Sequence, residues 1–305
     1  MKSTLVKVKR YWVLYLMFVP AAVYFLMNNY FPMAGLVIAF KKINFSLGIF
    51  KSPWVGLNNF KYLFKTADAW IITRNTLLYN LLFIVLNNLF GVAFAVLLNE
   101  IQSKKSRNIL QGTLMLPYLI SMVIVSYLAY GFLSGESGFI NNSILLPLGK
   151  EKIAWYATSK YWPWILTFVE IWKNAGYVSI IYYSTIVGID PGYYEAAALD
   201  GANRWQQIRH VILPELRSVV IILSLLGVSK IFYSDFGLFY QVPMNSGALY
   251  NATNTIDVYV YNALLNIGDI SMSSAAGFYQ SIVGFIVVLI ANGIVRKKSP
   301  ENAMF

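Results

Sequence analysis

The chain has 305 residues, of which 58% are hydrophobic and only 12% are charged, so it is more apolar and less charged than soluble domains normally are. This composition excludes an ordinary soluble protein and predicts an all-α polytopic membrane protein. The absence of Cys excludes disulfides and thiolate metal sites, and a single His cannot build a His-rich metal or catalytic cluster. The net charge of +11 would suit nucleic acid, but in so apolar a chain it favours basic loops at a membrane surface.

Six apolar stretches are each long enough to cross a bilayer as a helix, which takes about 20 residues. Together they predict one transmembrane domain that covers residues 1–305, with spans at 11–34, 76–98, 109–132, 162–187, 217–238 and 276–295. The first stretch follows a basic N-terminus, as a signal peptide would, but its apolar run is too long and no small-residue cleavage site follows it. We therefore expect it to remain as a span. Pro117 lies inside the third stretch and should kink that helix.

The distribution of basic residues predicts the orientation of the chain. With six spans, both termini lie on the same side of the membrane. That side would hold thirteen basic residues, namely Lys2, Lys7, Lys9, Arg10, Lys104, Lys105, Arg107, Arg204, Arg209, Arg217, Arg296, Lys297 and Lys298. The opposite side would hold nine, six of them in the first external loop. Because cytoplasmic loops carry the excess of Lys and Arg, we expect both termini in the cytoplasm.

The loop at 190–214, between the fourth and fifth predicted spans, has the pattern of two short helices with a break. Asp190 is a good N-cap, and Pro191 suits the first helical position because its missing N–H donor would be unpaired there anyway. Gly201 should break the helix, and Pro214 should start the next span. The loop is therefore predicted to project a helix, a turn and a helix into the cytoplasm.

The same loop resembles a known family. Glu195-Ala196-Ala197, Gly201 and Leu213-Pro214 stand at the spacing of the EAA loop in permease subunits of binding-protein-dependent ABC importers, with Val211 where the family has Ile. The resemblance implies the type I importer permease fold, with a coupling helix between helices 4 and 5 that docks on the ATPase. It assigns docking to Glu195, Ala196, Ala197, Ala198, Asp200, Gly201 and Arg204. The alternative is an interfacial amphipathic helix that lays Tyr193 and Trp205 on lipid.

Other segments resemble the sugar-type permeases of this family. These segments are 53–60 and 138–141, together with 255–261, which is similar to a branch importing complex oligosaccharides in Gram-positive bacteria. The resemblance implies a multi-pass protein of the bacterial cell membrane that moves a sugar or oligosaccharide inward. Its implied partners are a second, similar permease, an ABC ATPase dimer and an external solute-binding lipoprotein.

No G-x-x-x-x-G-K-[ST] phosphate cradle occurs in the sequence. ATP must then be hydrolysed by another chain. We therefore expect a transport subunit that is not itself an enzyme and holds no cofactor, with ATP and Mg²⁺ bound in the partner ATPase.

Polar residues inside the predicted spans are the candidates for the substrate path, because charge in a membrane helix is costly and usually faces a cavity or a partner. The candidates are Asn174, Tyr177, Lys173, Lys230, Tyr233 and Asp235. Glu170 lies three residues before Lys173, so these two either pair with each other or line the path. In the last external loop, Asp257, Tyr259 and Tyr261 are candidates for contact with the binding protein, the alternative being ordinary solvation.

Three other classes of function stay open. A membrane-embedded enzyme would need His or carboxylate clusters, and the one His, His210, lies in the cytoplasmic loop. A secondary transporter would usually show internal inverted repeats, which the sequence does not display. A purely structural scaffold is the third alternative.

Overall fold

The computed structural model describes residues 10–303, so Lys2, Lys7 and Lys9 of the topology count lie outside the described residues. In this part of the chain the secondary structure is helical, apart from one isolated antiparallel bridge between Lys41 and Trp54. The main helices are α2 (Trp12–Phe25), α5 (Ala67–Glu100), α6 (Lys104–Leu119), α7 (Met122–Leu133), α8 (Trp162–Val187), α11 (Leu213–Ser229) and α14 (Ile270–Lys298). The short α-helices are α3 (Gly48–Lys51), α4 (Asn58–Lys65), α9 (Pro191–Leu199), α10 (Arg204–Gln207), α12 (Tyr250–Thr253) and α13 (Ile256–Asn262).

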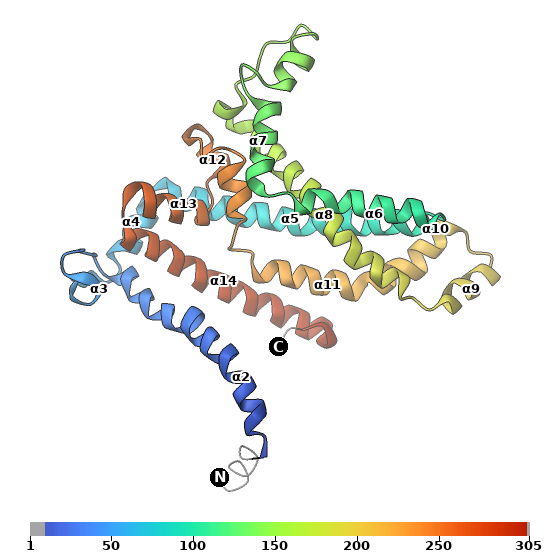
Figure 1. Ribbon diagram of the computed structural model, residues 1–305, viewed down its shortest axis with the longest axis horizontal. Helices are drawn as coiled ribbons and strands as arrows, with labels where there is room; N and C mark the ends of the chain where they lie inside the picture. Colours follow the sequence, from blue (N-terminus) through green and yellow to red (C-terminus); the bar gives the residue numbers. More distant parts are fainter. Residues whose placement is uncertain (1–9, 304–305) are drawn as a thin grey trace.

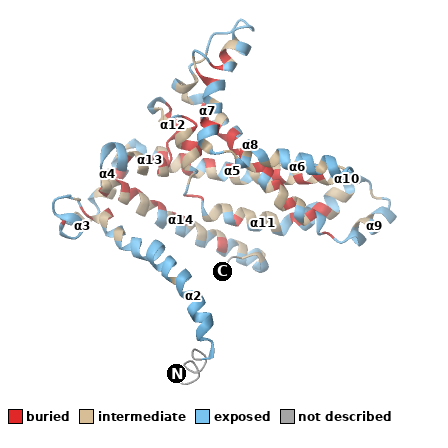
Figure 2. Cartoon of the chain, in the orientation of Figure 1, coloured by how far each residue is buried: buried red, intermediate tan, exposed pale blue. Residues whose placement is uncertain are grey.

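Within residues 10–303, four helices are long and apolar enough to cross a membrane. They are Trp12–Phe40, Ala67–Glu100, Arg204–Ser229 and Ile270–Lys298, and they overlap the predicted first, second, fifth and sixth spans. The first continues α2 through a π-helical turn, Leu26–Tyr30, and a 3-10 segment, Phe31–Phe40. It leaves the bundle and is exposed along almost its whole length, whereas buried residues gather where α5, α8 and α11 meet (Figures 1 and 2).

The third predicted span, 109–132, is wrong as a single helix. It is broken into α6 and α7, whose axes differ by 93°, and α7 turns away from the bundle at the break (Figure 1). Ile120 and Ser121 are extended just after Pro117, and the Ser121 hydroxyl accepts a hydrogen bond from the N–H of Ile124. Ser121 is thus the N-cap of α7, and the turn between the two helices is sharper than the kink expected from Pro117 alone.

The fourth predicted span, 162–187, coincides with α8. This helix is long enough to cross a bilayer, but it carries buried polar residues, Glu170 and Lys173 among them. It packs against α5 and α6. At Gly176 an added Cβ would lie 1.9 Å from the backbone oxygen of Leu114, so the backbone of α6 rests directly on α8. Neighbouring helices thus cover the face of α8 that carries Glu170 and Lys173, whereas Trp164 and Phe168 on another face stay exposed.

The fifth predicted span, 217–238, begins earlier and ends earlier than expected. Helix runs from Arg204 to Ser229 through α10, a π-helical turn at Ile208–Ile212, and α11. Pro214 lies in the first turn of α11, as predicted, but the helix already continues into α11 from α10 through the wider π turn, which accommodates the missing N–H donor. After Lys230 the backbone leaves the helix until a second π turn at Gly237–Gln241.

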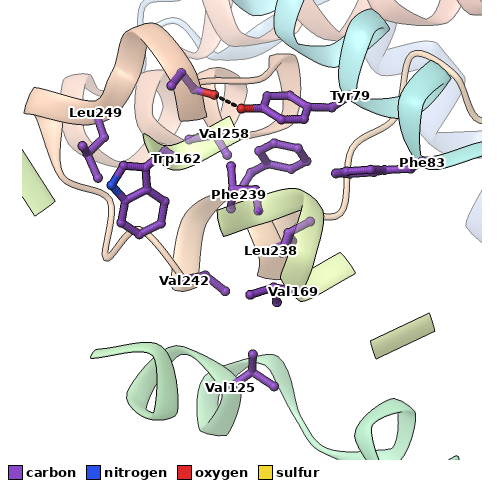
Figure 3. Packing of buried hydrophobic residues seen from close by; sticks show 12 residues of the cluster. Tyr79, Phe83, Val125, Trp162, Val169, Leu238, Phe239, Val242, Leu249 and Val258 are labelled. Carbon is purple, nitrogen blue, oxygen red and sulfur yellow. Dashed lines mark hydrogen bonds between the residues drawn. The ribbon is translucent and has the colours of Figure 1, made fainter. Parts of the chain in front are cut away.

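The largest described core lies where α5, α7 and α8 meet the segment 236–258 (Figure 3). Trp162 at the start of α8 is fully buried there, beside Phe239, which packs edge-on against the ring of Tyr79. The Tyr79 hydroxyl donates a 2.9 Å hydrogen bond to the backbone oxygen of Ala252. This core fixes the segment after α11 against α5 and α8, which are the helices that form the cavity described below.

Candidate functional site

The cytoplasmic loop predicted from residues 190–214 is a capped helix followed by a turn. The Asp190 carboxylate accepts a 2.8 Å hydrogen bond from the N–H of Gly192 at the start of α9. Gly201 ends the helix with φ +75°, a conformation that glycine adopts without strain, and the N–H of Ala202 reaches back to the Ala197 oxygen. Asn203 then starts α10 in a reciprocal capping box with Gln206.

Most of the α9 surface is uncovered within the described chain. No residue of α9 is buried, and the Leu199 side chain at its end is 90% exposed. Tyr194 is the aromatic residue of α9 that packs against the body of the protein, in the cluster formed by α5, α8 and α11. Burial there, and next the Glu100 carboxylate, raises the pKa of the Tyr194 hydroxyl. One side of α9 thus rests on the helix bundle, and Glu195, Ala196 and Gly201 remain on the surface.

A polar cavity of about 310 Å³ lies between α5, α8 and the end of α11. The polar side chains and tyrosines in its lining are Asn80, Asn87, Asn88, Glu170, Tyr177, Lys230, Tyr233 and Asp235, and the rest of the lining is apolar apart from the backbone of Gly227: Phe83, Ile84, Val178, Ile181 and Leu223. Four of the six predicted path residues, Tyr177, Lys230, Tyr233 and Asp235, are therefore brought together. Asn174 is partly buried and is not among the lining residues, and Lys173 has a different role, described below.

The buried end of this cavity accepts hydrogen bonds. Glu170 is only 8% exposed, and its carboxylate accepts a 3.2 Å hydrogen bond from the Asn87 side-chain amide. The side-chain oxygen of Asn87 is buried and has no hydrogen-bond partner among the described residues. An unpaired buried acceptor is costly in isolation, so this pair is suited to a ligand that carries hydroxyl or ammonium donors.

Sequence reasoning did not find the three Asn residues of α5 that line the cavity. They follow the spacing i, i+7 and i+8, which places Asn80, Asn87 and Asn88 on one face of a helix. Three amides on one face of an otherwise apolar span could have predicted that this face of the helix lines a polar cavity.

Comparison with known proteins identifies the family. Residues 87–299 match the binding-protein-dependent transport system inner membrane component family. The chain belongs to this family. It is therefore the permease of an importer that works with a binding protein, and from here on we call it the permease.

Individual relatives agree over nearly the whole length. The permease is 35% identical to the polygalacturonan/rhamnogalacturonan transport system permease protein YteP of Bacillus subtilis, over 99% of this chain and 93% of the relative. It is 32% identical to Protein LplB of the same organism, over 95% and 90% of the two chains. It is also similar to the trehalose/maltose transport system permease protein MalF of Thermococcus litoralis, at 26% identity over 78% of this chain and 77% of that one.

Solved structures share the fold. A chain from a bacterial ABC transporter involved in the import of the acidic polysaccharide alginate superposes with a TM-score of 0.88 at 31% identity, covering 97% of the permease and 99% of that chain. A second alginate transporter structure, in complex with alginate pentasaccharide-bound periplasmic protein, superposes with a TM-score of 0.86 at 30% identity, covering 96% and 97% of the two chains. The permease therefore has the type I ABC permease fold.

Lys173 supports the broken helix instead of lining the cavity. Its side chain is 9% exposed, and its ammonium donates to the backbone oxygens of Pro117, Tyr118 and Ile120, at 3.2 Å and 3.0 Å for the first two. These carbonyls lie at the C-terminal end of α6, where the helix dipole favours a cation. Of the two alternatives for Glu170 and Lys173, the structure does not show a direct ion pair, since Lys152–Glu136 is the salt bridge found within residues 10–303.

Lys230 and Asp235 were predicted inside a helical span, but they lie in the non-helical segment after α11. Side chains of other helices satisfy the free backbone groups of this segment. The Asn80 amide donates to the oxygens of Ile231 and Tyr233, at 2.8 Å and 3.1 Å. The Gln280 amide of α14 donates to the Phe232 oxygen at 2.6 Å. Non-helical backbone at membrane depth is tolerated where protein groups pair it in this way.

Of the three residues predicted to contact a binding protein, Tyr259 is buried and Asp257 and Tyr261 are partly buried. The Asp257 carboxylate accepts hydrogen bonds from the backbone N–H and hydroxyl of Ser234 and from Gln280. Tyr259 is buried, and Tyr261 packs its ring against Phe236 and Tyr240. Asp257 and Tyr259 therefore hold the segment after α11 in place, which leaves little of either residue to face a partner.

Proposed function

We propose that the permease carries an oligosaccharide through the cavity between α5, α8 and α11. The observation that carries this proposal is the group of polar side chains that three apolar helices bring together in the lining of that cavity. Amides and a buried carboxylate suit the hydroxyl groups of a sugar. Tyr233 offers a ring face for stacking, as does the face of Tyr177 opposite the one stacked on Tyr118. The sugar substrates in the names of the relatives support the same class of cargo.

We further propose that the cargo is acidic. The relatives named for polygalacturonan and alginate both handle glycans that carry carboxylates. Lys230 is the one cation among the lining residues of the cavity, it is exposed, and its ammonium makes no hydrogen bond to any described residue. A cation free in this way is suited to pair with a sugar carboxylate.

The α9 loop is proposed to dock on a separate ATPase. An exposed leucine at the end of a short exposed helix favours burial against another protein, as in helix-in-groove recognition. Glu195, Ala197 and Gly201 keep the spacing of the family motif, and the small Ala side chains allow close approach. In this assignment the permease transmits force, and hydrolysis of ATP with Mg²⁺ occurs in the partner.

The remaining partners and the orientation are proposals of the same kind. The most apolar stretch of the span Trp12–Phe40 has no buried residue, so this span is free to pack against a second, similar permease as well as lipid. We propose six crossings of the bacterial cell membrane, with α8 inside the bundle, both termini cytoplasmic, and an external solute-binding lipoprotein that delivers the cargo.

A pair of variants tests the cargo site. Lys230→Met in the reconstituted importer should lower uptake of an acidic oligosaccharide, leave uptake of a neutral one less affected, and preserve basal ATPase activity. The matched control is Lys150→Met, an exposed lysine outside the cavity. Equal uptake by Lys230→Met and the control would remove Lys230 from the path.

A further inference from the structure

The loop that follows the N-terminal span, residues 42–53, is closed at its base. We call it the outer loop. Lys41 pairs with Trp54 in the antiparallel bridge, and the Trp54 ring stacks on Phe40 at 5.7 Å between centroids. The Ser271 hydroxyl at the start of α14 accepts a 3.0 Å hydrogen bond from the N–H of Ile43. These contacts fix the outer loop to the bundle.

Many backbone groups of the outer loop are paired within it or by its base. The Lys41 ammonium, almost buried, donates to the oxygens of Ile49 and Phe50 at 3.1 Å and 2.7 Å. These are carbonyls of the last turn of α3. Ser52 donates to the Gly48 oxygen at 2.7 Å, and its hydroxyl accepts from the N–H of Asn44 at 2.9 Å. A loop that satisfies its own carbonyls in this way loses less on leaving bulk water.

The tip of the outer loop presents apolar side chains to its surroundings. Phe45 is 76% exposed and Phe50 is 91% exposed, with the exposed Leu47 and Ile49 between them. The charges around the tip have one sign, because residues 41–67 contain five Lys and neither Asp nor Glu. Lys42 and Lys51 flank the tip and are exposed.

We propose that the outer loop is a membrane anchor, in which Phe45 and Phe50 enter the adjacent leaflet while Lys42 and Lys51 bind the phosphates of anionic phospholipids. Aromatic side chains with lysines beside them are typical of the membrane–water interface. The combination also explains why the first external loop is basic although most basic residues were expected on the opposite side.

The position of the outer loop favours lipid over a protein partner. It begins at the residue after Phe40, where the N-terminal span ends, so it cannot leave the membrane surface by more than its own length. Figure 1 shows α3 at the outer edge of the molecule, beside the end of the N-terminal helix and at the opposite end from α9. A cargo-delivering protein would dock over the bundle, whereas this edge faces the surrounding bilayer.

The absence of Cys makes the test direct. Phe50→Cys, labelled with the fluorophore NBD in the full-length permease, is reconstituted into nanodiscs of phosphatidylcholine with phosphatidylglycerol. We expect a blue-shifted emission that lipids brominated on their acyl chains quench strongly. The same label on Glu151→Cys, an exposed residue of another loop, should not be quenched. Phe45→Cys gives a second labelled position should the first variant fold poorly.

The role of the lysines is tested in the same nanodiscs. Lys42→Glu with Lys51→Glu, or omission of phosphatidylglycerol, should reduce quenching at position 50. The proposal is overturned if the label at position 50 is as water-exposed as the label at 151 in both lipid mixtures. It is also overturned if the label becomes shielded only after a periplasmic binding protein is added, because the tip would then be a protein-docking surface.

Discussion

Lys173→Met should destabilise the permease by removing the hydrogen bonds that hold the turn between α6 and α7 against α8. The Lys173 ammonium donates to three backbone oxygens at the end of α6. Hydrogen bonds to charged groups contribute about 1.5–3 kcal/mol each. Removing the buried cation also removes its desolvation cost of several kcal/mol, which offsets much of that loss. We therefore expect a net loss of about 2–4 kcal/mol.

The assay is thermal denaturation of the purified, full-length permease in detergent. The measured quantity is the fraction of protein that stays monodisperse at each temperature. The expected fall in the apparent melting temperature is about 5–10 °C. Lys230→Met is the matched control, because it removes an exposed lysine of the same bundle and should leave the melting temperature unchanged. Lys173→Arg should recover part of the loss, since a guanidinium still donates to carbonyls.

A structural readout separates the break from general loss of packing. Spin labels on α6 and α7, placed in the cysteine-free chain, should report a wider distribution of distances in Lys173→Met. If Lys173→Met melts at the same temperature as the unmodified chain and keeps the narrow distance distribution, the assignment of Lys173 to the break is refuted.

Three further outcomes are expected. Gly176→Ala should lower stability by about 1–3 kcal/mol in the same melting assay, because its Cβ would meet the backbone of α6, whereas Gly112→Ala, with open space around it, should not; equal melting of the two would contradict the packing of α6 on α8. Glu195→Lys combined with Gly201→Val should abolish co-purification of the ATPase without loss of the folded permease, and unchanged association would exclude docking through α9. Gln280→Leu should cost about 1–3 kcal/mol by leaving the oxygen of Phe232 unpaired, and a neutral effect on melting would show that water or lipid can replace the amide.

Much of the fold follows from local pattern. Hydropathy predicted the bounds of α8 correctly. It also predicted the central parts of α5 and α14, although both helices are longer than the predicted spans. The ends of α9 were also predicted from the sequence, because Asp190 acts as an N-cap and Gly201 adopts a positive φ, and both effects depend on local backbone conformation. Features of this kind depend on residues a few positions apart.

The breaks could be predicted only in part. Pro117 indicated a kink in the third span, but the causes of the full 93° turn and of the break after α11 lie across helices. Hydropathy does not distinguish a straight span from the turn at Ile120, which is held by a lysine on α8. Hydropathy also predicted that the fifth span continues past Lys230. In the structure the helix ends there, and the side-chain amides of Asn80 on α5 and Gln280 on α14 bond the free backbone oxygens. A lysine in a predicted span could support the fold or line the path, and tertiary contacts were needed to show that Lys173 holds the end of α6 while Lys230 lines the cavity.

The central claim is tested most directly by uptake into sealed vesicles that contain the permease, a second permease and the ATPases, with the binding protein outside. We expect uptake of an acidic oligosaccharide that requires ATP inside, is blocked by vanadate, and is lost in the Glu195→Lys, Gly201→Val variant while that variant remains folded. Uptake that proceeds without ATP and follows an ion gradient instead would contradict the claim, and would make the protein a secondary transporter.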